Sequence, residues 1–260
     1  AILSNLSVYS NYMQIVTKYL YPLTKRIIPT SQNGSFALFG GMLFGFPLGS
    51  KISADLVSQK SIGKEEGEIL AVSFNQLSPV FVSGYLLTNI LELPHLTIPS
   101  YAALYLPPVC YSIWKLKKLK PQNAKNSASD SAFDFRIIDA GIMNGFESLT
   151  KLGGYIILFS IFAAILHTYN TSYPLINFIC TGLVEVTTGI SCLKDSALPR
   201  EYVYPLAVFF ASFGGLCGFA QTCSMTRECS FSKMRYLICR MCFAAVSCLL
   251  AWLFYHIWKL

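Results

Sequence analysis

The sequence predicts an all-α polytopic membrane protein built from two inverted repeats with re-entrant or broken-helix hairpins. Hydrophobic residues make up 53% of the 260 residues, charged residues only 13%, and the mean hydropathy is +0.49. A soluble domain has about one quarter charged residues. Several apolar stretches approach the about 20 residues that a helix needs to cross a bilayer. This composition excludes a soluble globular protein.

The prediction of repeats comes from a glycine-rich phrase that occurs twice. Residues 39–47 read FGGMLFGFP, residues 213–220 read FGGLCGFA, and small polar residues follow both. Gly- or Pro-interrupted apolar segments in both halves of a membrane protein indicate discontinuous helices around a central site, as in secondary transporters. The alternative is that the glycines only allow close helix packing. The polar residues that follow favour the first interpretation.

Two amphipathic segments support the same division of the chain. Residues 8–28 and 135–146 each place apolar side chains at helical spacing among charged ones, which is typical of helices on a membrane surface. The segment 116–133 is rich in Lys, Pro, Asn and Ser. We therefore expect one repeat in residues 1–115, a basic cytoplasmic linker in residues 116–133 and a second repeat in residues 134–260.

Apolar runs between the polar stretches give the remaining helices. One run begins after a turn at residues 61–63 and is interrupted by Asn75-Gln-Leu-Ser-Pro79. A proline removes a helical hydrogen bond, and the freed carbonyls at membrane depth are tolerated only where protein, ions or water satisfy them. We expect helices, several of them membrane-spanning, within residues 36–48, 64–93, 101–114, 149–167, 173–193, 204–227 and 237–258.

The net charge of +7 is concentrated in one short loop. Four lysines follow the apolar run that ends at Trp114, and clusters in such loops stay on the cytoplasmic side. We expect them to contact anionic lipid headgroups. No other part of the chain resembles a base-reading surface, so we expect no nucleic-acid partner. The lysines are Lys115, Lys117, Lys118 and Lys120.

Catalytic and metal-binding patterns are lacking. The sequence contains no phosphate-binding loop, no GxSxG elbow and no HExxH motif, and its three histidines are isolated. Cys239 and Cys242 form a CxxC in an apolar run without a second pair, so we interpret the nine cysteines as small core residues. We expect neither an enzyme nor a metal site.

Five separated motifs resemble a known family. They are residues 45–56 (GFPLGSKISADL), 62–66 (IGKEE), 75–82 (NQLSPVFV), 182–190 (GLVEVTTGI) and 214–221 (GGLCGFAQ). Together they are similar to the sporulation integral membrane proteins with paired nucleoside-recognition (Gate) domains. The last motif also resembles the second re-entrant hairpin of concentrative nucleoside transporters.

This resemblance implies two gate-type repeats, a place in the bacterial cell membrane or a forespore membrane, and a family role in moving dipicolinate during spore formation. Two departures bear on it. The family begins with one or more helices that this sequence lacks, and the chain opens at Ala1 without Met in what reads as the tail of a hydrophobic helix. We therefore expect its start to be missing. Gln221-Thr-Cys223 also replaces the small polar pattern of nucleoside carriers, which leaves the substrate open.

The predicted substrate site lies at the helix breaks. Half-helix N-termini offer free N–H groups and partial positive charge, which suit the two carboxylates of a flat ring such as dipicolinate. Lys51 can pair with one carboxylate or reach lipid headgroups. Asn75 and Ser78 can contact a ligand or satisfy the kinked backbone. The predicted substrate-binding residues are Gly45, Pro47, Gly49, Ser50, Lys51, Asn75, Ser78, Pro79, Gly218, Gln221 and Thr222.

Glu185 is the candidate ion-coupling residue. A carboxylate inside a membrane segment costs about 3 kcal/mol even on the milder insertion scales, so it usually has a function. Thr187, Thr188 and Gly189 follow within about one turn and can add oxygen ligands for a coupled H+ or Na+. The alternative is a structural ion pair with Arg200 or Arg227. We expect no other cofactor.

These observations favour secondary transport of a small solute, with dipicolinate or another anionic or nucleoside-like solute as the substrate implied by the resemblance. The alternative is a non-transporting structural membrane protein of sporulation. Such a protein would keep the packing glycines but would not need Glu185 or the polar residues at the predicted hairpin tips. The expected partners are the solute and the lipid bilayer, and a homo-oligomer is compatible with either function.

Overall fold

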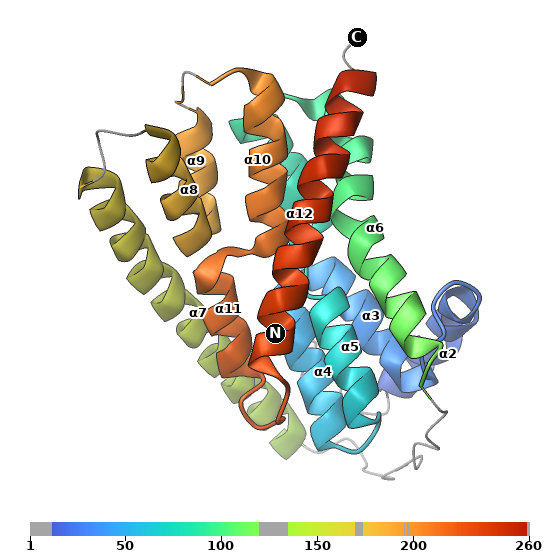
Figure 1. The fold of residues 1–260 in the computed structure, drawn as a ribbon. Coiled ribbons are helices and arrows are strands. Elements are labelled where there is room, and N and C mark those ends of the chain that lie inside the picture. Colours follow the sequence, from blue (N-terminus) through green and yellow to red (C-terminus); the bar gives the residue numbers. More distant parts are fainter. Residues whose placement is uncertain (1–11, 120–134, 170–173, 195, 197, 259–260) are drawn as a thin grey trace. The chain divides into compact units, whose positions relative to one another are not determined.

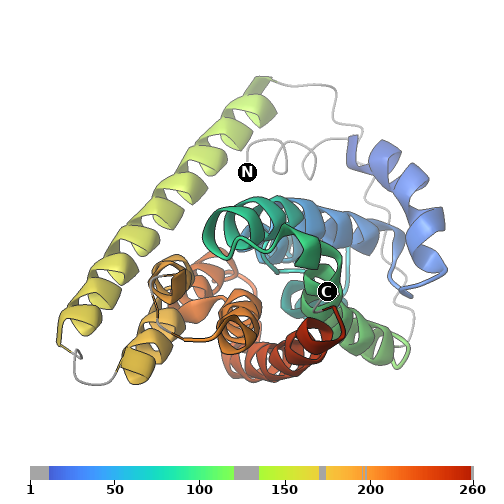
Figure 2. The ribbon, with the colours of Figure 1, turned by 90° about the horizontal axis from the view of Figure 1, so that it is seen from above.

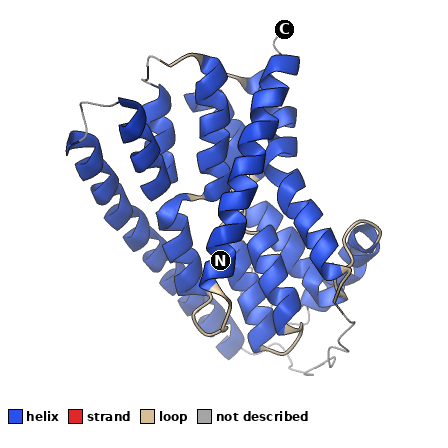
Figure 3. Cartoon of the chain, viewed as in Figure 1, coloured by secondary structure: helices blue, strands red, loops and turns tan. Residues whose placement is uncertain are grey.

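The structure is a computed structural model that describes residues 12–119, 135–169, 174–194, 196 and 198–258. These residues form helices and connecting loops (Figure 1; Figure 3), as the sequence predicts. In chain order the elements are α2 (Tyr12–Lys25), α3 (Gln32–Phe44), α4 (Leu48–Ser58), α5 (Lys64–Ser73), the π-helix η1 (Phe81–Ile90), the 3-10 turn η2 (Pro94–Leu96), α6 (Thr97–Leu116), α7 (Phe135–Tyr169), α8 (Pro174–Val184), α9 (Val186–Lys194), α10 (Arg200–Phe213), α11 (Gly215–Met225) and α12 (Lys233–Ile257).

Three of the described segments are long and apolar enough to cross a membrane: Ile138–Thr168, Arg200–Met225 and Lys233–Ile257. The first lies in α7 and buries almost none of its apolar surface within the chain. The second consists of α10 and α11, which are separated at Gly214. Two shorter apolar helices, Phe81–Ile90 and Leu175–Val184, accompany them. The chain therefore has the helices of an integral membrane protein.

The chain divides into two compact units, and each draws on both halves of the sequence. The first contains residues 1–75, 109–153 and 222–232, and the second contains residues 76–108, 154–221 and 233–260. We describe each unit by itself.

In the first unit, α3, α4 and α5 pack side by side (Figure 1). Ser31 caps α3 by accepting a hydrogen bond from the Gly34 N–H. The Glu66 carboxylate, in the first turn of α5, accepts hydrogen bonds from Thr30 Oγ1 (2.8 Å) and the Ser31 N–H (2.7 Å). One acidic side chain therefore ties the start of α3 to the start of α5.

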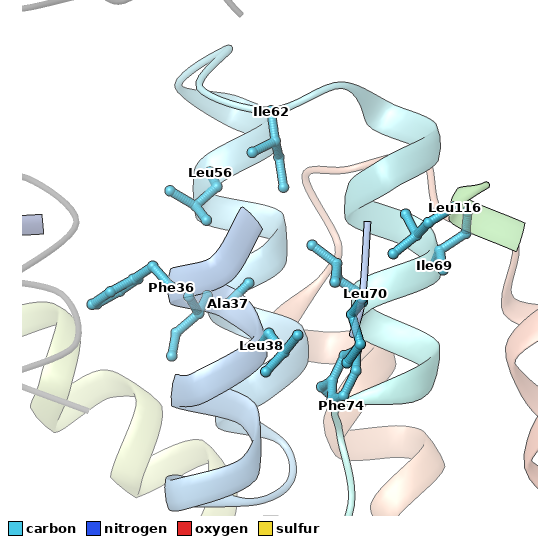
Figure 4. Close-up of a cluster of buried hydrophobic side chains, with 11 residues drawn as sticks. Phe36, Ala37, Leu38, Leu56, Ile62, Ile69, Leu70, Phe74 and Leu116 are labelled. Atoms are coloured by element: carbon cyan, nitrogen blue, oxygen red, sulfur yellow. The ribbon is translucent and has the colours of Figure 1, made fainter. Parts of the chain in front are cut away.

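A hydrophobic cluster holds these three helices together (Figure 4). Leu38 of α3, Leu56 of α4 and Leu70 of α5 are each at most 3% exposed. Complete burial of one such side chain stabilises a fold by about 2 kcal/mol. Leu116, at the end of α6, lies beside Ile69 in the same cluster. This apolar packing positions the break between α3 and α4 against α5.

In the second unit, α8 and α9 pack against α10, and α10 packs along α12 (Figure 1; Figure 2). Ser212 of α10 and Ser247 of α12, both fully buried, are joined by a hydrogen bond of 3.2 Å. Ser100 of α6 and Tyr204 of α10 form another, of 2.8 Å. Pairs of small or hydroxyl side chains of this kind are typical of helix contacts in membranes.

The predicted element boundaries hold in outline and differ at two places. The segment predicted as residues 173–193 is two helices, α8 and α9, which are separated at Glu185. The predicted segments 135–146 and 149–167 form the single helix α7, which contains no proline and continues through residues 147–148. Residues 8–11, 120–134 and 259–260, which include most of the predicted linker, lie outside the described residues.

Candidate functional site

Four breaks interrupt the helices within the described residues, at residues 45–47, 74–80, 185 and 214. Each break leaves backbone N–H and C=O groups without helical partners, and these groups require other partners where water is excluded. Residue 45 and residue 214 are glycines with φ of 73° and 82°, values that glycine adopts without steric cost. The groups that satisfy the freed backbone are the candidate site.

The break between α3 and α4 depends on close backbone contact. The Phe46–Pro47 peptide is cis. A Cβ on Gly49 would lie 2.8 Å from Gly41 Cα, and the Phe74 carbonyl oxygen faces both glycines. Only glycine fits at residues 41 and 49. The Gly45–Pro47–Gly49 pattern predicted from the sequence is therefore used to bring two short helices and the end of α5 together.

Asn75 caps the N-terminus of α4 at this break. Its Oδ1 accepts a hydrogen bond from the Ser50 N–H (3.2 Å), and its Nδ2 donates to Thr222 Oγ1 (2.9 Å). The Ser50 hydroxyl donates to the Pro47 carbonyl (2.7 Å). Ser50, Asn75 and Thr222 are at most 4% exposed. The first unit thus brings predicted site residues from three distant parts of the sequence into one buried polar cluster.

Lys51 forms an ion pair within its own helix. Its Nζ lies 3.2 Å from the Asp55 carboxylate, one turn further along α4, and both side chains are less than 20% exposed. Burial raises the pKa of the Asp55 carboxyl above its ordinary value, and the Lys51 ammonium opposes that shift. The positive charge predicted to face a substrate is therefore largely balanced by a neighbour that the sequence interpretation did not include.

Tyrosines of α6 satisfy the break that follows α5. The Tyr105 hydroxyl donates to the Leu77 carbonyl (2.6 Å), and the Tyr101 hydroxyl donates to the Pro79 carbonyl (2.9 Å). Ser78 Oγ accepts from the Phe81 N–H (3.3 Å) at the start of η1. These contacts match the alternative in which Ser78 and its neighbours satisfy the kinked backbone. Sequence reasoning missed the two tyrosines, although their spacing of four residues puts both on one face of α6.

In the second unit, Glu185 caps α9 with its own side chain. Its carboxylate accepts four hydrogen bonds, from the Thr187 N–H (3.1 Å) and Oγ1 (2.6 Å) and from the Thr188 N–H (2.7 Å) and Oγ1 (2.7 Å). The side chain is 2% exposed. A carboxylate at a helix N-terminus also interacts favourably with the helix dipole. The Glu185 carboxylate therefore contacts both Thr187 and Thr188, as their spacing in the sequence predicts. The sequence does not predict that these contacts cap α9.

Glycines pack the break at Glu185 as they do the first one. A Cβ on Gly189 would collide with Gly182 of α8, and Gly215 faces the Val184 carbonyl and the Val186 N–H on either side of Glu185. The α8–α9 break is thus pressed against the α10–α11 break. Arg200, one of the ion-pair partners considered for Glu185, instead places its Nη2 atom 3.9 Å from the Glu92 carboxylate.

Arg240 satisfies the break between α10 and α11. Its Nε donates to the Phe213 carbonyl (3.2 Å), the last residue of α10, and the side chain is 1% exposed in a candidate membrane span. A cation at a helix C-terminus interacts favourably with the helix dipole. Sequence reasoning missed Arg240. The signal that could have found it was a charge inside the last apolar run.

The other predicted residues of this region contact their own helix. The Gly218 N–H donates to the Gly214 carbonyl (3.2 Å), and Gln221 Nε2 contacts Cys217 Sγ at 3.1 Å. Within the described residues, no group of three or more His, Cys, Asp or Glu side chains could hold a metal ion.

The glycine-rich phrase that occurs twice in the sequence lies at two of these breaks. Residues 39–47 cover the end of α3 and the α3–α4 break, whereas residues 213–220 cover the α10–α11 break and the start of α11. The two copies of the phrase therefore differ in their position relative to the break. Two other pairs of segments are similar in sequence. Residues 41–49 (GMLFGFPLG) match residues 182–189 (GLVEVTTG), and residues 73–79 (SFNQLSP) match residues 212–218 (SFGGLCG).

Comparison with known proteins shows a distant relationship. The chain is 23% identical to the sporulation integral membrane protein YlbJ of Bacillus subtilis (strain 168) over 292 aligned positions, which cover 96% of this chain and 72% of that protein. No protein-family model and no solved structure matches the chain. The chain is therefore an integral membrane protein and a distant homologue of a bacterial sporulation membrane protein.

Proposed function

We propose that this protein is a secondary transporter of a small anionic or nucleoside-like solute, with dipicolinate as the preferred substrate. The observation that carries the proposal is the set of four helix breaks whose freed backbone groups meet polar or charged side chains, of which Asn75, Glu185 and Arg240 are buried. Discontinuous helices of this kind supply the binding sites of secondary transporters. The preference for dipicolinate rests on the family resemblance of the sequence and on the relationship to a sporulation membrane protein.

Two inverted gate-type repeats are part of this proposal. Residues 41–49 span the α3–α4 break and residues 182–189 span the α8–α9 break, and two helices further along the chain each is followed by an SF-x-x-L segment, at residues 73–77 or 212–216. The order of a break, two helices and a second break therefore occurs twice. This correspondence supports a duplication more strongly than the repeated glycine phrase, because it agrees in both sequence and place.

Glu185 is the proposed coupling residue. Two threonine hydroxyls and two backbone N–H groups already hold its carboxylate, and its Oε1 accepts only one of the four hydrogen bonds. A carboxylate oxygen can accept more than one, so Oε1 keeps capacity for a proton or a sodium ion. Rotation of either hydroxyl would offer a further oxygen. This arrangement supports ion coupling without requiring a buried ion pair.

We also propose that the lysine-rich end of α6 faces the cytoplasm. Lys115 Nζ lies 4.6 Å and Lys118 Nζ 4.2 Å from the ring centroid of Trp114, which is half exposed. Tryptophan with flanking lysines is typical of the membrane interface on the cytoplasmic side. An impermeant thiol reagent should fail to label a cysteine introduced at Lys118 in intact cells, in a variant whose native cysteines are replaced. Labelling from outside would reverse the orientation.

The function is tested by uptake into proteoliposomes. Purified protein is reconstituted, and uptake of labelled dipicolinate, uridine and adenosine is measured with and without a proton or sodium gradient. We expect saturable dipicolinate uptake that a gradient stimulates, and none in empty liposomes. Uptake of none of the three solutes by well-folded protein would favour the structural membrane protein of sporulation. We propose no enzymatic activity for this chain.

A further inference from the structure

A second polar site lies in the second unit, away from the helix breaks. A cavity of about 210 Å³ opens where the end of η1, the end of α9 and the start of α10 meet. Its polar lining includes Glu92, Lys194, Arg200 and Ser196. Its apolar lining comes mainly from Leu91, Leu93, Leu193, Leu198 and Val203. A pocket with an apolar wall and a few convergent polar groups is the usual form of a small-molecule site.

The charges of this pocket favour an anion. Lys194 ends α9, and Arg200 begins α10, where the helix dipole disfavours a cation. Pro199, the residue before α10, makes no side-chain hydrogen bond to that helix end. Two cations therefore line the same cavity, and one of them, Lys194, also donates a hydrogen bond to the Asn89 carbonyl (3.2 Å). Asp195, which follows Lys194 in the sequence, lies outside the described residues.

The carboxylate already present fits these cations poorly. Glu92 lies 3.9 Å from Lys194 Nζ and 3.9 Å from Arg200 Nη2, one carboxylate oxygen facing each cation. A charge-assisted hydrogen bond is about 2.7–2.9 Å long. Glu92 also has φ of 57°, which is unusual for a residue other than glycine. Backbone outliers of this kind cluster at functional sites.

We propose that this pocket binds a small carboxylate, whose carboxylate group replaces Glu92 between Lys194 and Arg200. The body of the ligand then packs on the leucines and Val203. Glu92 acts as an internal competitor that occupies the cations when the ligand is absent. The proposal rests on the proposed function only for the choice of probe, a flat aromatic dicarboxylate.

Equilibrium dialysis of purified protein with labelled isophthalate tests this site. We expect saturable binding that the uncharged isophthalamide does not displace. Glu92→Gln should tighten binding about threefold, because it removes the competitor from two exposed ion pairs. The double variant Lys194→Gln/Arg200→Gln should weaken binding at least tenfold, because two charge-assisted contacts are lost. All three side chains are at least 45% exposed, so these variants should fold.

Glu147→Gln is the matched control, since it removes the same charge from an exposed ion pair in the other unit. It should leave isophthalate binding unchanged.

Equal effects of Glu92→Gln and Glu147→Gln would overturn the competitor role. Absence of isophthalate binding, or wild-type binding by the double variant, would overturn the site. Displacement of isophthalate by short-chain phosphatidylglycerol in the wild type only would assign the pocket to a lipid headgroup instead. If isophthalate binds in this way but none of the three solutes is taken up by proteoliposomes, the pocket remains a binding site and the proposed transport function is overturned.

Discussion

The α3–α4 break and the α8–α9 break each leave N–H groups at a helix N-terminus that need a hydrogen-bond acceptor. Two different kinds of side chain supply it. At the first, the neutral side chain of Asn75 reaches the α4 N-terminus from the end of α5 and is itself held by Thr222. At the second, Glu185 caps α9 from the adjacent position, and two threonines of the same helix complete the contacts. One cap is neutral and depends on distant segments. The other is charged and local.

This difference distinguishes the residues that allow close helix packing, which both breaks share, from the charged group, which only one break has. Both breaks use facing glycines to bring the helix backbones together, so close packing cannot be the reason for a charge at only one of them. An amide satisfies a helix N-terminus adequately, as Asn75 demonstrates. A buried carboxylate at the second break is therefore more than the backbone requires, and this surplus is the physical argument for an ion-coupling role at Glu185.

The largest expected effect comes from filling the glycine contact at the charged break. Gly189→Ala would place a Cβ against the Gly182 backbone, which cannot move as a flexible side chain can. We expect a loss of about 3 kcal/mol of stability, measured by thermal melting in detergent. Gly154→Ala is the control, because a Cβ there meets nothing within 4 Å and should instead be slightly stabilising. Equal melting temperatures for the two variants would show that the α8–α9 contact is loose.

Removing the neutral cap should have the next largest effect. Asn75→Ala leaves the buried Ser50 N–H without its side-chain acceptor and removes the hydrogen bond to Thr222. An unsatisfied buried donor costs about 2 kcal/mol. The melting temperature should fall accordingly, whereas Asn89→Ala, at an exposed position of η1, should leave it nearly unchanged. A small effect of Asn75→Ala would mean that water or another group caps α4.

Changing the charged cap tests coupling directly. Glu185→Gln keeps the shape but removes the charge and one acceptor oxygen, so we expect about 1 kcal/mol of destabilisation from the weaker cap. This is less than the 3–5 kcal/mol expected from breaking a buried ion pair. Dipicolinate uptake should lose its dependence on the gradient. A variant that melts early, but whose residual uptake still follows the gradient, would assign Glu185 a structural role alone.

The sequence predicts the helical class and most helix boundaries, because apolar runs and their Gly and Pro interruptions are local signals. It also places Glu185 next to Thr187 and Thr188, since residues two and three positions apart at a helix start are neighbours by geometry. It does not place Asn75 beside Ser50 and Thr222, or Arg240 beside Phe213. These contacts join segments 25 to 147 residues apart, which only the packed chain brings together.

The break at Glu185 is a second feature that could not be predicted from the sequence. Residues 173–193 contain Gly182 and Gly189 but no proline after Pro174, and their hydropathy is that of a continuous helix. The interruption arises because the Glu185 side chain competes for the N–H groups of the next turn. The same local competition by acidic and amide side chains normally marks helix starts. The sequence predicts Glu185 as an ion ligand in the membrane, but it does not predict that the same side chain caps α9.

The smallest expected effect concerns Lys51, the cation beside the neutral break. Lys51→Gln removes the ion pair with Asp55, and a pair of this spacing on one helix contributes about 0.5 kcal/mol. Without the ammonium, the pKa of the Asp55 carboxyl, already raised by burial, should rise further. A raised pKa means that folding favours the protonated acid, so stability should fall as the pH increases from the ordinary value of 3.8 through the folded-state value. The variant should therefore melt earlier than the wild type above that window and nearly together with it below.

Uptake by the same variant separates the two roles of Lys51. If its charge only balances Asp55, Lys51→Gln/Asp55→Asn should restore wild-type melting, and dipicolinate uptake should be normal in the double variant. If Lys51 also pairs with the substrate, the double variant should melt normally but show a raised KM for dipicolinate. Lys151→Gln, which breaks the exposed pair with Glu147, provides the control for loss of one positive charge. An unchanged KM in the double variant would remove Lys51 from the substrate site and leave the neutral break with capping groups alone.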